Sequence, residues 1–534
     1  MRHWIVGAAV TAMGAASPDT RAAPPEPVPA RAIRSGVKVP ASPTWTRFRG
    51  PNGSGVAEGS TFPTKFGPER NVIWKVALPA GHSSPVLDRD RIYVTASEGD
   101  TLLTIALDRA TGATLWRREA PRPRVLRVDR RNHPAAATPT TDGGKVYVFF
   151  QDFGLIAYDR AGREQWKVPL GPFDNAYGMG SSPIVADGVV VLVCDQSNGS
   201  FMIAVGKDDG RIRWRVERPE SKSGHSTPVV YRPAGTPPQL VIPGSFLLTG
   251  YDLATGEKLW WARGLAFEMK ATPVIQGTTV FIHGTSTSSF EDSYGGKIPA
   301  FQDLRADNDK DQDGRFSREE VPDALAKKWF SLMDLDHDSL LDPQEWAYYR
   351  AARSSKGGMW AFTLGGKGDI TDSAVQWHFD RSIPQLTSPL LYQGVLYIVN
   401  DGGVMTALDP AKGEPLVKSR LEGAVDSFYA SPVAADGKIL VVSESGKAVV
   451  LKADGALTIL SVNELDGMVY ATPAIAGDRL YVRTTSALYC FGGSTLVPSG
   501  PTKEAKPQIR RRPRLTGVAV RRTLTTTVRA AQFT

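Results

Sequence analysis

The stretch ALDRATGATLW at residues 106–116 decides the fold of this chain, because a close copy of it, GYDLATGEKLW, returns at residues 250–260. In both copies an apolar run leads into a turn, and a tryptophan follows the turn glycine by four residues. With related positions the element occurs eight times, at Trp74, Gly112/Trp116, Gly162/Trp166, Gly210/Trp214, Gly256/Trp260, Trp377, Gly413/Val417 and Gly455/Ile459. Such regular recurrence indicates a repeat architecture.

A second element recurs independently and also eight times. It is a Ser or Thr followed by Pro and an apolar run, found at Ser84, Thr138, Ser182, Thr227, Thr272, Ser388, Ser431 and Thr472. The first unit contains four short alternating or β-branched runs, 84–88, 91–95, 102–107 and 114–118, which predict four antiparallel strands. Four-stranded units that repeat every roughly 40–50 residues are typical of β-propellers. We therefore predict an all-β, eight-bladed β-propeller over residues 45–492.

The two ends of the repeat array predict how the ring closes. The last unit, residues 472–490, supplies only three strands, whereas Trp74 lies in a strand that precedes the first unit. We expect this N-terminal strand to complete the last blade, which would remove two open sheet edges.

Charge is concentrated at the C-terminal end of the chain. The chain has 534 residues and a formal net charge of +8, and residues 493–534 alone contain nine basic side chains and one acidic side chain. The rest of the chain is therefore balanced, which argues against a nucleic-acid partner. Residues 493–534 have few large apolar residues and no periodicity, so we expect a disordered basic tail.

The N-terminal end has the pattern of a signal peptide. A charged start and a short apolar run precede small residues at Gly14 and Ala16, and residues 24–44 are rich in proline. We predict a signal peptide over 1–23, a linker over 24–44 and an exported, periplasmic or secreted protein. No later run reaches the roughly 18 apolar residues that a transmembrane helix needs.

One unit contains a long insertion with a metal-binding motif. Pro273 and Pro389 lie 116 residues apart, and the excess contains the sequence DKDQDGRFSREE at 309–320. Alternating carboxylates, a glycine at the sixth position and a glutamate at the twelfth match the calcium loop of an EF-hand. The predicted ligands are Asp309, Asp311, Asp313, the Arg315 carbonyl, a water near Ser317, and Glu320.

A second loop follows 25 residues later. Its predicted ligands are Asp334, Asp336, Asp338, Leu340, Asp342 and Glu345, and Ser339 occupies the usual glycine position. We expect Ser339 to be strained there. Residues 321–333 between the loops suffice for one shared helix, with Val321, Leu325, Trp329 and Met333 expected on one face. We predict a small α-helical EF-hand pair over 299–358, inserted in the fifth blade, and calcium as its ion.

Propeller topology predicts a ligand-binding funnel on the face that carries this insertion. The residue three before each repeat proline lies in the loop that crosses to the next blade, so these residues should surround the central channel. They are His82, Ala136, Gly180, His225, Lys270, Leu386, Tyr429 and Tyr470. We take His82, His225, Lys270, Tyr429 and Tyr470 as the candidate ligand-binding residues; ordinary loop side chains and water filling the channel are the alternative.

The repeats quoted above resemble the PQQ-type propeller repeats of quinoprotein dehydrogenases and of the β-barrel assembly lipoprotein of Gram-negative outer membranes. The segments WTRFRGPNGSGV (45–56) and GHSSPV (81–86) resemble a family of exported bacterial PQQ-like propellers. The resemblance implies two functions: a calcium-stabilised binding or assembly scaffold, or a PQQ-dependent dehydrogenase with the quinone on the propeller axis.

The residues favour the scaffold over the oxidoreductase. The adjacent cysteine pair that many alcohol-oxidising relatives place over the quinone is absent, since Cys194 and Cys490 belong to different units. No convincing ligand set for an active-site calcium accompanies the repeats, and no nucleophile elbow, HExxH or Walker motif is present. We therefore assign no catalytic residue and expect a protein partner or a small ligand at the propeller face.

Overall fold

The computed structural model describes residues 44–285, 298–322 and 324–493. Over these residues the strands build eight sheets of four or five strands, each with the antiparallel order of a propeller blade. The predicted all-β, eight-bladed β-propeller is confirmed. The proposed signal peptide, all but the last residue of the linker, and the basic tail beyond residue 493 lie outside the described residues.

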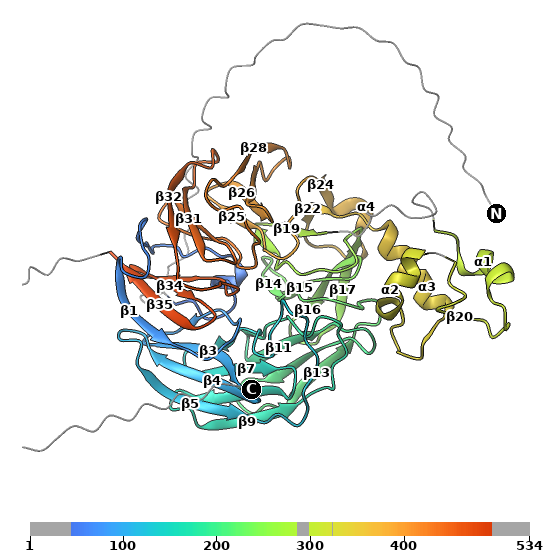
Figure 1. The fold of residues 1–534 in the computed structure, drawn as a ribbon, viewed down its shortest axis with the longest axis horizontal. Helices are drawn as coiled ribbons and strands as arrows, with labels where there is room; N and C mark the ends of the chain where they lie inside the picture. Colours follow the sequence, from blue (N-terminus) through green and yellow to red (C-terminus); the bar gives the residue numbers. More distant parts are fainter. Residues whose placement is uncertain (1–43, 286–297, 323, 494–534) are drawn as a thin grey trace, which may run out of the picture. The chain divides into compact units, whose positions relative to one another are not determined.

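The first three blades each follow the chain without interruption (Figure 1). Blade 1 is made of β2 (Val86–Leu87), β3 (Arg91–Glu98), β4 (Thr101–Asp108) and β5 (Thr114–Ala120). Blade 2 is made of β6 (Thr140–Thr141), β7 (Lys145–Phe150), β8 (Gly154–Asp159) and β9 (Glu164–Pro169). Blade 3 is made of β10 (Ile184–Ala186), β11 (Val189–Cys194), β12 (Phe201–Gly206) and β13 (Ile212–Glu217).

The next four blades repeat this order. Blade 4 is made of β14 (Val229–Tyr231), β15 (Gln239–Gly244), β16 (Leu247–Asp252) and β17 (Lys258–Arg263), and blade 5 of β18 (Val274–Gln276), β19 (Thr279–Gly284), β22 (Gly358–Thr363) and β24 (Val375–Phe379). Blade 6 is made of β25 (Leu390–Tyr392), β26 (Val395–Asn400), β27 (Val404–Leu408) and β28 (Pro415–Arg420), and blade 7 of β29 (Val433–Ala435), β30 (Lys438–Val442), β31 (Lys447–Lys452) and β32 (Ile459–Glu464).

The ring closes with strands from both ends of the repeat array. Blade 8 is made of β33 (Ala474–Ala476), β34 (Arg479–Arg483) and β35 (Ala487–Gly492), and β1 (Val72–Ala77) is its outer strand. Trp74 of β1 lies opposite Cys490 of β35 in an antiparallel register, and Figure 1 shows blue β1 beside red β35. The expected closure by the N-terminal strand is confirmed.

Blade 4 carries one strand that the repeats did not predict. β23 (Gly368–Asp369) pairs in parallel with β17 and makes this a five-stranded sheet; the short helix α4 (Thr371–Ala374) follows β23. Because β23 comes from the loop between β22 and β24 of blade 5, it also covers the outer edge of its neighbour.

A helical insertion separates β19 from β22 in blade 5. It consists of α1 (Phe301–Asn308), β20 (Phe316–Ser317), α2 (Ala324–Met333), β21 (Leu340–Leu341) and α3 (Pro343–Ser354). The two short strands pair with each other, Phe316 opposite Leu341. The insertion has its own apolar core, which includes Phe301, Phe316, Phe330, Met333, Leu341 and Trp346.

The expected buried face of the shared helix was partly wrong. Val321 and Met333 are buried, but Trp329 is 37% exposed, and Ala326 and Phe330 lie in the core instead. An α-helix has 3.6 residues per turn, so residues spaced exactly four apart rotate gradually around its surface. The series that starts at Val321 therefore leaves the buried face. Leu325 belongs to the same prediction, and its side chain is not described.

The repeated tryptophans connect neighbouring blades. In five of them the indole N–H donates to a backbone carbonyl in the outer turn of the next blade: Trp74 to Arg109 (3.3 Å), Trp116 to Arg160 (2.9 Å), Trp166 to Lys207 (3.0 Å), Trp214 to Leu253 (3.1 Å) and Trp377 to Pro410 (3.0 Å). Trp260 instead donates to the Gln239 side chain of its own blade (2.8 Å). The turn glycine lies against the ring, and a Cβ on Gly162 would come within 2.7 Å of Trp116. The Gly/Trp spacing in the sequence therefore records contacts between blades.

The Ser and Thr residues before the repeat prolines form a ring around the axis. In all but Thr272 the hydroxyl oxygen accepts from the backbone N–H of its counterpart in the preceding blade. The bonds are Ser84 to Thr138 (3.0 Å), Thr138 to Ser182 (3.0 Å), Ser182 to Thr227 (3.1 Å), Thr272 to Ser388 (2.9 Å), Ser388 to Ser431 (3.0 Å), Ser431 to Thr472 (3.0 Å) and Thr472 to Ser84 (3.0 Å), donor named first. Seven of the eight junctions in this described part of the chain are joined in this way.

An N-terminal segment, residues 45–56, ties distant blades together. Asn52 exchanges two hydrogen bonds with Val230 of blade 4 (2.8 and 2.9 Å), and the buried guanidinium of Arg47 donates to the carbonyl of Pro228. Arg49, also buried, donates to the carbonyl of Pro389 at the start of blade 6 (2.7 Å). The hydroxyl ring is interrupted at one junction, between blades 4 and 5, and this segment supplies contacts beside it.

Replacing Thr138 by Val tests the hydroxyl ring. Val keeps the shape of Thr but leaves the buried Ser84 N–H without an acceptor, so we expect the free energy of unfolding to fall by about 1–3 kcal/mol. Denaturant unfolding of the purified protein measures this change. Thr138→Ser, which retains the hydroxyl, should lose much less; equal losses in the two variants would show that methyl packing, and not the ring, stabilises the junction.

Candidate functional site

The loop 309–320 of the insertion gathers carboxylate oxygens around one point. One ligand atom from each of Asp309, Asp311 and Glu320 lies within 4.8 Å of the others. The Glu320 carboxylate is held by the backbone N–H groups of Lys310 (2.9 Å) and Ser317 (2.8 Å), which direct it back across the loop. The loop is therefore already folded around a position where an ion could sit.

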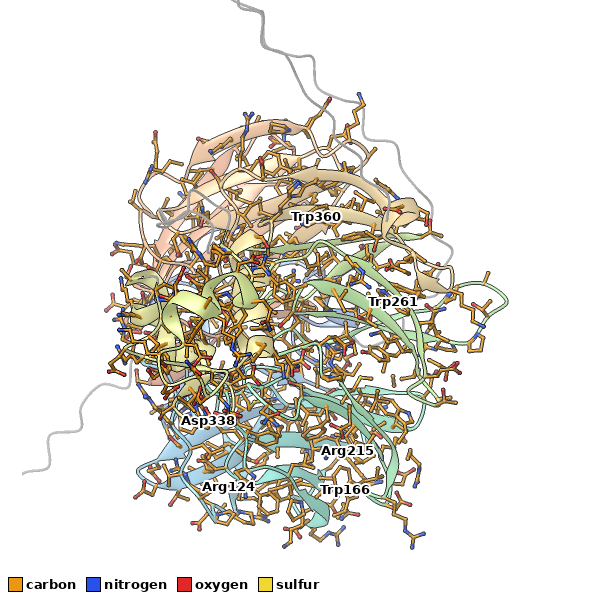
Figure 2. All side chains as sticks on the ribbon, turned by 90° about the vertical axis from the view of Figure 1, so that its right-hand side faces the viewer. Arg124, Trp166, Arg215, Trp261, Asp338 and Trp360 are labelled. Atoms are coloured by element: carbon orange, nitrogen blue, oxygen red, sulfur yellow. The ribbon has the colours of Figure 1, made fainter. Side chains whose placement is uncertain are left out.

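The loop 334–345 repeats the backbone hydrogen bonds of this arrangement, with a different set of convergent acids. Asp334, Asp336 and Asp338 form the second group of convergent oxygens, and Asp338 is labelled in Figure 2. The Glu345 carboxylate accepts from Leu335 N–H (2.6 Å) and Asp342 N–H (3.0 Å), the same two loop positions that hold Glu320. Two loops with the same internal bonds, joined by β20 and β21, make one compact unit.

The first aspartate of each loop presents an oxygen with no partner. Asp309 and Asp334 are each 7% exposed, and in both the Oδ2 atom accepts from the residue at the sixth loop position, while Oδ1 is buried without a hydrogen bond. A buried carboxylate oxygen without a partner is costly. Both clusters could hold a metal ion, and this oxygen would be its ligand.

Several predicted ligand residues also form hydrogen bonds within the loops. Asp313 Oδ1 accepts from the N–H of Arg315 (2.8 Å), Ser317 Oγ donates to Glu320 (2.8 Å), and Leu340 N–H donates to Asp338 (2.9 Å). Asp342 and Glu345 cap the start of α3 and, like Asp313, are not among the convergent oxygens. The Arg315 side chain pairs with Asp338 Oδ2 (2.6 Å) and links the two loops.

Backbone geometry distinguishes the two loops as the sequence predicted. Gly314 has φ +85° and Ser339 has φ +68° at the equivalent position. A left-handed backbone costs a side-chain-bearing residue about 1–2 kcal/mol relative to glycine. The strain expected at Ser339 is present.

The central cavity contains all eight residues expected around the channel. Together with six hydroxyl residues of the ring, they line a space of about 220 Å³. The eight residues are His82, Ala136, Gly180, His225, Lys270, Leu386, Tyr429 and Tyr470. Phe48 of the N-terminal segment lines it as well and forms one wall. The topological argument therefore placed these eight residues around one cavity, as the structure has them.

Aromatic rings make up much of the cavity wall. His82 stacks on Tyr470 at 4.0 Å between ring centres, and Tyr429 lies 4.9 Å from Tyr470. Burial lowers the pKa of His82 to about 3 and that of His225 to about 4, which outweighs the opposite effect of Glu268 on His225. Both imidazoles are therefore neutral at physiological pH and add polar but uncharged surface.

The cavity's cations are paired with carboxylates. Lys270 Nζ lies 2.5 Å from the buried Glu268 carboxylate, which also lies 3.9 Å from His225, and Arg131 pairs with Asp129 at 2.6 Å. Burial raises the pKa of Glu268, but the Lys270 ammonium and the hydrogen bonds from Lys270 and Ser223 outweigh it, so the pKa is lowered overall and the carboxylate is ionised. The wall is electrically balanced, which suits a ligand with mixed polar and aromatic character.

Sequence reasoning missed several residues of this wall. Tyr177 and Arg131 line the cavity, and Glu268 stands behind it, but none lies at the repeat position used for the prediction. Their only signal was the greater length of the crossing loops that carry them, for example 121–139 between β5 and β6.

A PQQ cofactor, which the repeat type implies, does not fit the described residues. PQQ is an anionic quinone, and Arg131 and Lys270 are already occupied by acidic partners. Cys194 and Cys490 are buried in blades 3 and 8, and in the described ranges the metal-capable acidic groups all belong to the insertion. No reaction step is therefore assigned to the cavity.

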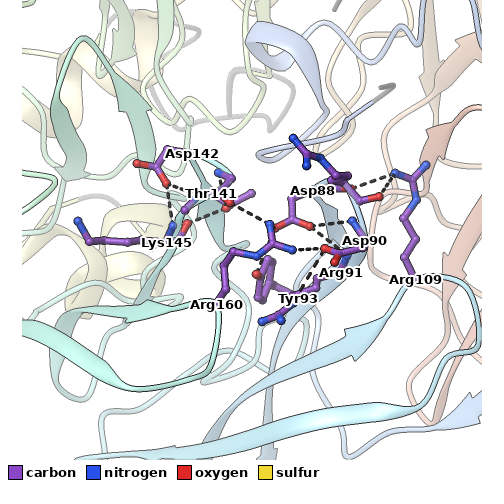
Figure 3. A network of polar contacts seen from close by, with 12 residues as sticks. Asp88, Asp90, Arg91, Tyr93, Arg109, Thr141, Asp142, Lys145 and Arg160 are labelled. Carbon is purple, nitrogen blue, oxygen red and sulfur yellow. Dashed lines mark hydrogen bonds and ion pairs between the residues drawn. The ribbon is translucent and has the colours of Figure 1, made fainter. Parts of the chain in front are cut away.

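A second polar cavity, of about 860 Å³, lies among the turns of blades 1 and 2. Figure 3 shows Arg160 of blade 2 reaching across to Asp90 and to Asp88 of blade 1, the latter at 3.2 Å, while Arg109 donates to the Asp88 carbonyl (2.9 Å). The acids there are matched by basic side chains, so the network joins two blades.

Among the described residues no helix is both long and apolar enough to span a membrane.

Comparisons with known proteins agree with this architecture. A family model described as outer membrane protein assembly factor BamB matches residues 68–177 and 104–308. The outer membrane protein assembly factor BamB of Yersinia pestis is 23% identical over 398 residues, which cover 72% of this chain and 88% of that protein.

Two solved structures are similar to the chain at low identity. BamB from Moraxella catarrhalis is 14% identical, with a TM-score of 0.48 over 79% of this chain and 99% of that one. A europium-containing methanol dehydrogenase is 11% identical, with a TM-score of 0.52 over 84% of this chain and 98% of that one. From its repeats and its eight blades, the chain is an eight-bladed β-propeller, and it is similar to these proteins.

Proposed function

We propose that this protein is an exported, calcium-binding propeller that acts as a binding or assembly scaffold, with calcium held by two EF-hand loops in the insertion. The observation that carries the calcium assignment is the unpartnered, buried Oδ1 of both Asp309 and Asp334, at the first position of two loops with corresponding backbone hydrogen bonds. Calcium prefers six to eight oxygen ligands, which is the donor set that these loops offer.

The scaffold assignment rests on the central cavity and on the curated relative. The cavity wall combines stacked aromatic rings, neutral imidazoles and paired charges, a composition that suits recognition of a peptide segment or a small ligand. The similar protein of Yersinia pestis is named as an outer membrane protein assembly factor, which favours a protein partner over a metabolite. That name and the signal-peptide pattern of residues 1–23 together support export.

Asparagine substitutions test the two metal sites. In calorimetric titration of the full chain with calcium, we expect two binding events for the unchanged protein. Asp309→Asn should weaken the first by at least tenfold and Asp334→Asn the second, because each removes the charge of a buried ligand. Asp380→Asn, which neutralises an exposed acid outside the loops, should change neither. An absence of binding heat, together with no change in calcium-dependent stability, would refute the calcium assignment.

Exchanging the sixth loop residue tests the strain at Ser339. Ser339→Gly should raise the calcium affinity of loop 334–345 by roughly fivefold, corresponding to relief of about 1 kcal/mol of backbone strain. Gly314→Ser should weaken loop 309–320 by a similar factor. The same titration measures both changes, and an unchanged affinity in both variants would show that the backbone strain is not coupled to ion binding.

Replacing two cavity tyrosines tests the scaffold assignment. With the protein lacking residues 494–534 as bait in calcium, we expect capture of a specific exported partner. Tyr429→Ala combined with Tyr470→Ala should weaken its binding roughly thirtyfold, since interface aromatic anchors contribute about 2 kcal/mol or more. Trp329→Ala, a change of an exposed aromatic side chain on α2 outside the cavity, is the matched control.

The same preparation distinguishes the scaffold from an oxidoreductase. Incubation with PQQ and calcium followed by absorption spectroscopy and a dye-reduction assay with alcohols or sugars should give no bound quinone and no reduction. A quinone spectrum with substrate-dependent dye reduction would replace the scaffold assignment with that of a PQQ-dependent dehydrogenase.

A further inference from the structure

Two contacts between the described residues of the insertion and the propeller come from its second loop and the helix that follows. His337, the fourth residue of loop 334–345, lies 3.0 Å from Asp174 in the loop that crosses from blade 2 to blade 3. Tyr348 on α3 lies 3.2 Å from Ser245 Oγ in blade 4 and packs edge-on against Phe246 and Phe267, at 5.4 and 5.7 Å between ring centres. The insertion thus bridges separate blades on the face of the crossing loops.

The turn that receives Tyr348 is strained. Phe246 has φ +65°, a conformation that is rare for a bulky residue. Its N–H donates to Ala266 O (3.0 Å), and its carbonyl accepts from Gly264 N–H (3.1 Å), so the turn is fixed to the loop that leads to Glu268. Strained backbone persists where surrounding contacts fix it and is concentrated at functional sites.

A chain of polar contacts runs from this turn to the cavity. Ser245 Oγ accepts from the N–H of Lys222 (3.1 Å), and the adjacent Ser223 donates its hydroxyl to Glu268 Oε1 (2.9 Å). Glu268 in turn holds Lys270 at 2.5 Å and faces His225 at 3.9 Å, and both of these line the cavity. The rim residues 222–226 and 264–270 are therefore positioned by the turn that Tyr348 contacts.

The second loop also sets the position of Tyr348. Asp342 is the N-cap of α3 and Glu345 is its third residue, so predicted calcium ligands form the first turn of this helix. Tyr348 lies three residues after Glu345, on the same side of the helix. An ion that fixes Glu345 would therefore fix the direction in which α3 presents Tyr348.

We propose that calcium bound in loop 334–345 orders the rim of the central cavity through Tyr348, so that the insertion regulates access to the ligand site. This inference rests on the proposed calcium binding. By linkage, the factor by which calcium raises the affinity of a ligand that prefers the ordered rim equals the factor by which that ligand raises the calcium affinity of this loop. Calcium in loop 309–320 has no such direct path, because both contacts with the propeller described above arise from the second loop and α3.

Hydrogen exchange of the full chain, measured by mass spectrometry with calcium and with a calcium chelator, tests the coupling. In the unchanged protein, calcium should slow exchange in loop 334–345 and also, by about threefold or more, in 222–226 and 264–268. The Lys222 N–H reports directly, since it is bound to Ser245. Tyr348→Ala should keep the calcium effect in loop 334–345 but lose it in the rim segments.

The control variant is Trp329→Ala, which removes an aromatic side chain from the exposed part of α2. It should retain the calcium effect in both places. If loop 334–345 shows no calcium effect in the unchanged protein, the proposed calcium binding fails. If that loop responds but the rim does not, or if the rim response survives Tyr348→Ala, calcium binding stands and the coupling is wrong.

Discussion

The propeller depends on one repeated hydrogen bond between neighbouring blades. In this bond the backbone N–H of the Ser or Thr before a repeat proline donates to the equivalent Ser or Thr hydroxyl of the next blade. The proline fixes the chain direction at the start of each inner strand, and the hydroxyl satisfies a buried N–H that no strand partner can reach, because blades are separate sheets. A short β-branched or small polar side chain is needed, since a longer one would fill the channel. The repeated Trp and turn Gly supply the corresponding contact at the outer strands. Inner and outer contacts together make eight sheets into one ring.

These contacts explain why the fold could be predicted from the sequence. Each blade must present the same residues at the same places to its neighbours, so the contacts between blades appear as two independent periodic signals. The missing strand in the last unit and the extra strand that contains Trp74 then required closure between the two ends, as β1 and β35 show. The strand β23 left no such signal, because it is two residues long and pairs with only one neighbour.

The candidate sites were predictable to different degrees for the same reason. The loop residues of the insertion follow a local pattern in which every ligand lies within 12 residues, and the eight channel residues follow from the repeat register. By contrast, Tyr177 and Arg131 reach the cavity from within irregular crossing loops, and Tyr348 reaches Ser245 across 103 residues of sequence. Such contacts depend on the conformations of irregular loops. These conformations leave no periodic pattern in a single sequence. The role of residues 45–56, which join blades 4, 6 and 7, was likewise visible only as a resemblance.

The position of the insertion follows from the same constraints. It replaces the turn between β19 and β22. Six residue pairs join these two strands in an antiparallel register, so the insertion leaves their pairing intact. The entropic cost of closing a loop grows only slowly with its length, so the blade tolerates a folded unit there. The hydroxyl ring is interrupted at the neighbouring junction, where Thr272 Oγ1 is buried without a partner. At that junction the Ser226 hydroxyl donates to Ala271 O (2.7 Å), and Arg47 and Asn52 hold the start of blade 4 from the other side. Blades 4 and 5 therefore depend less on the repeated contact and more on specific ones, and it is on these blades that the insertion is carried and docked.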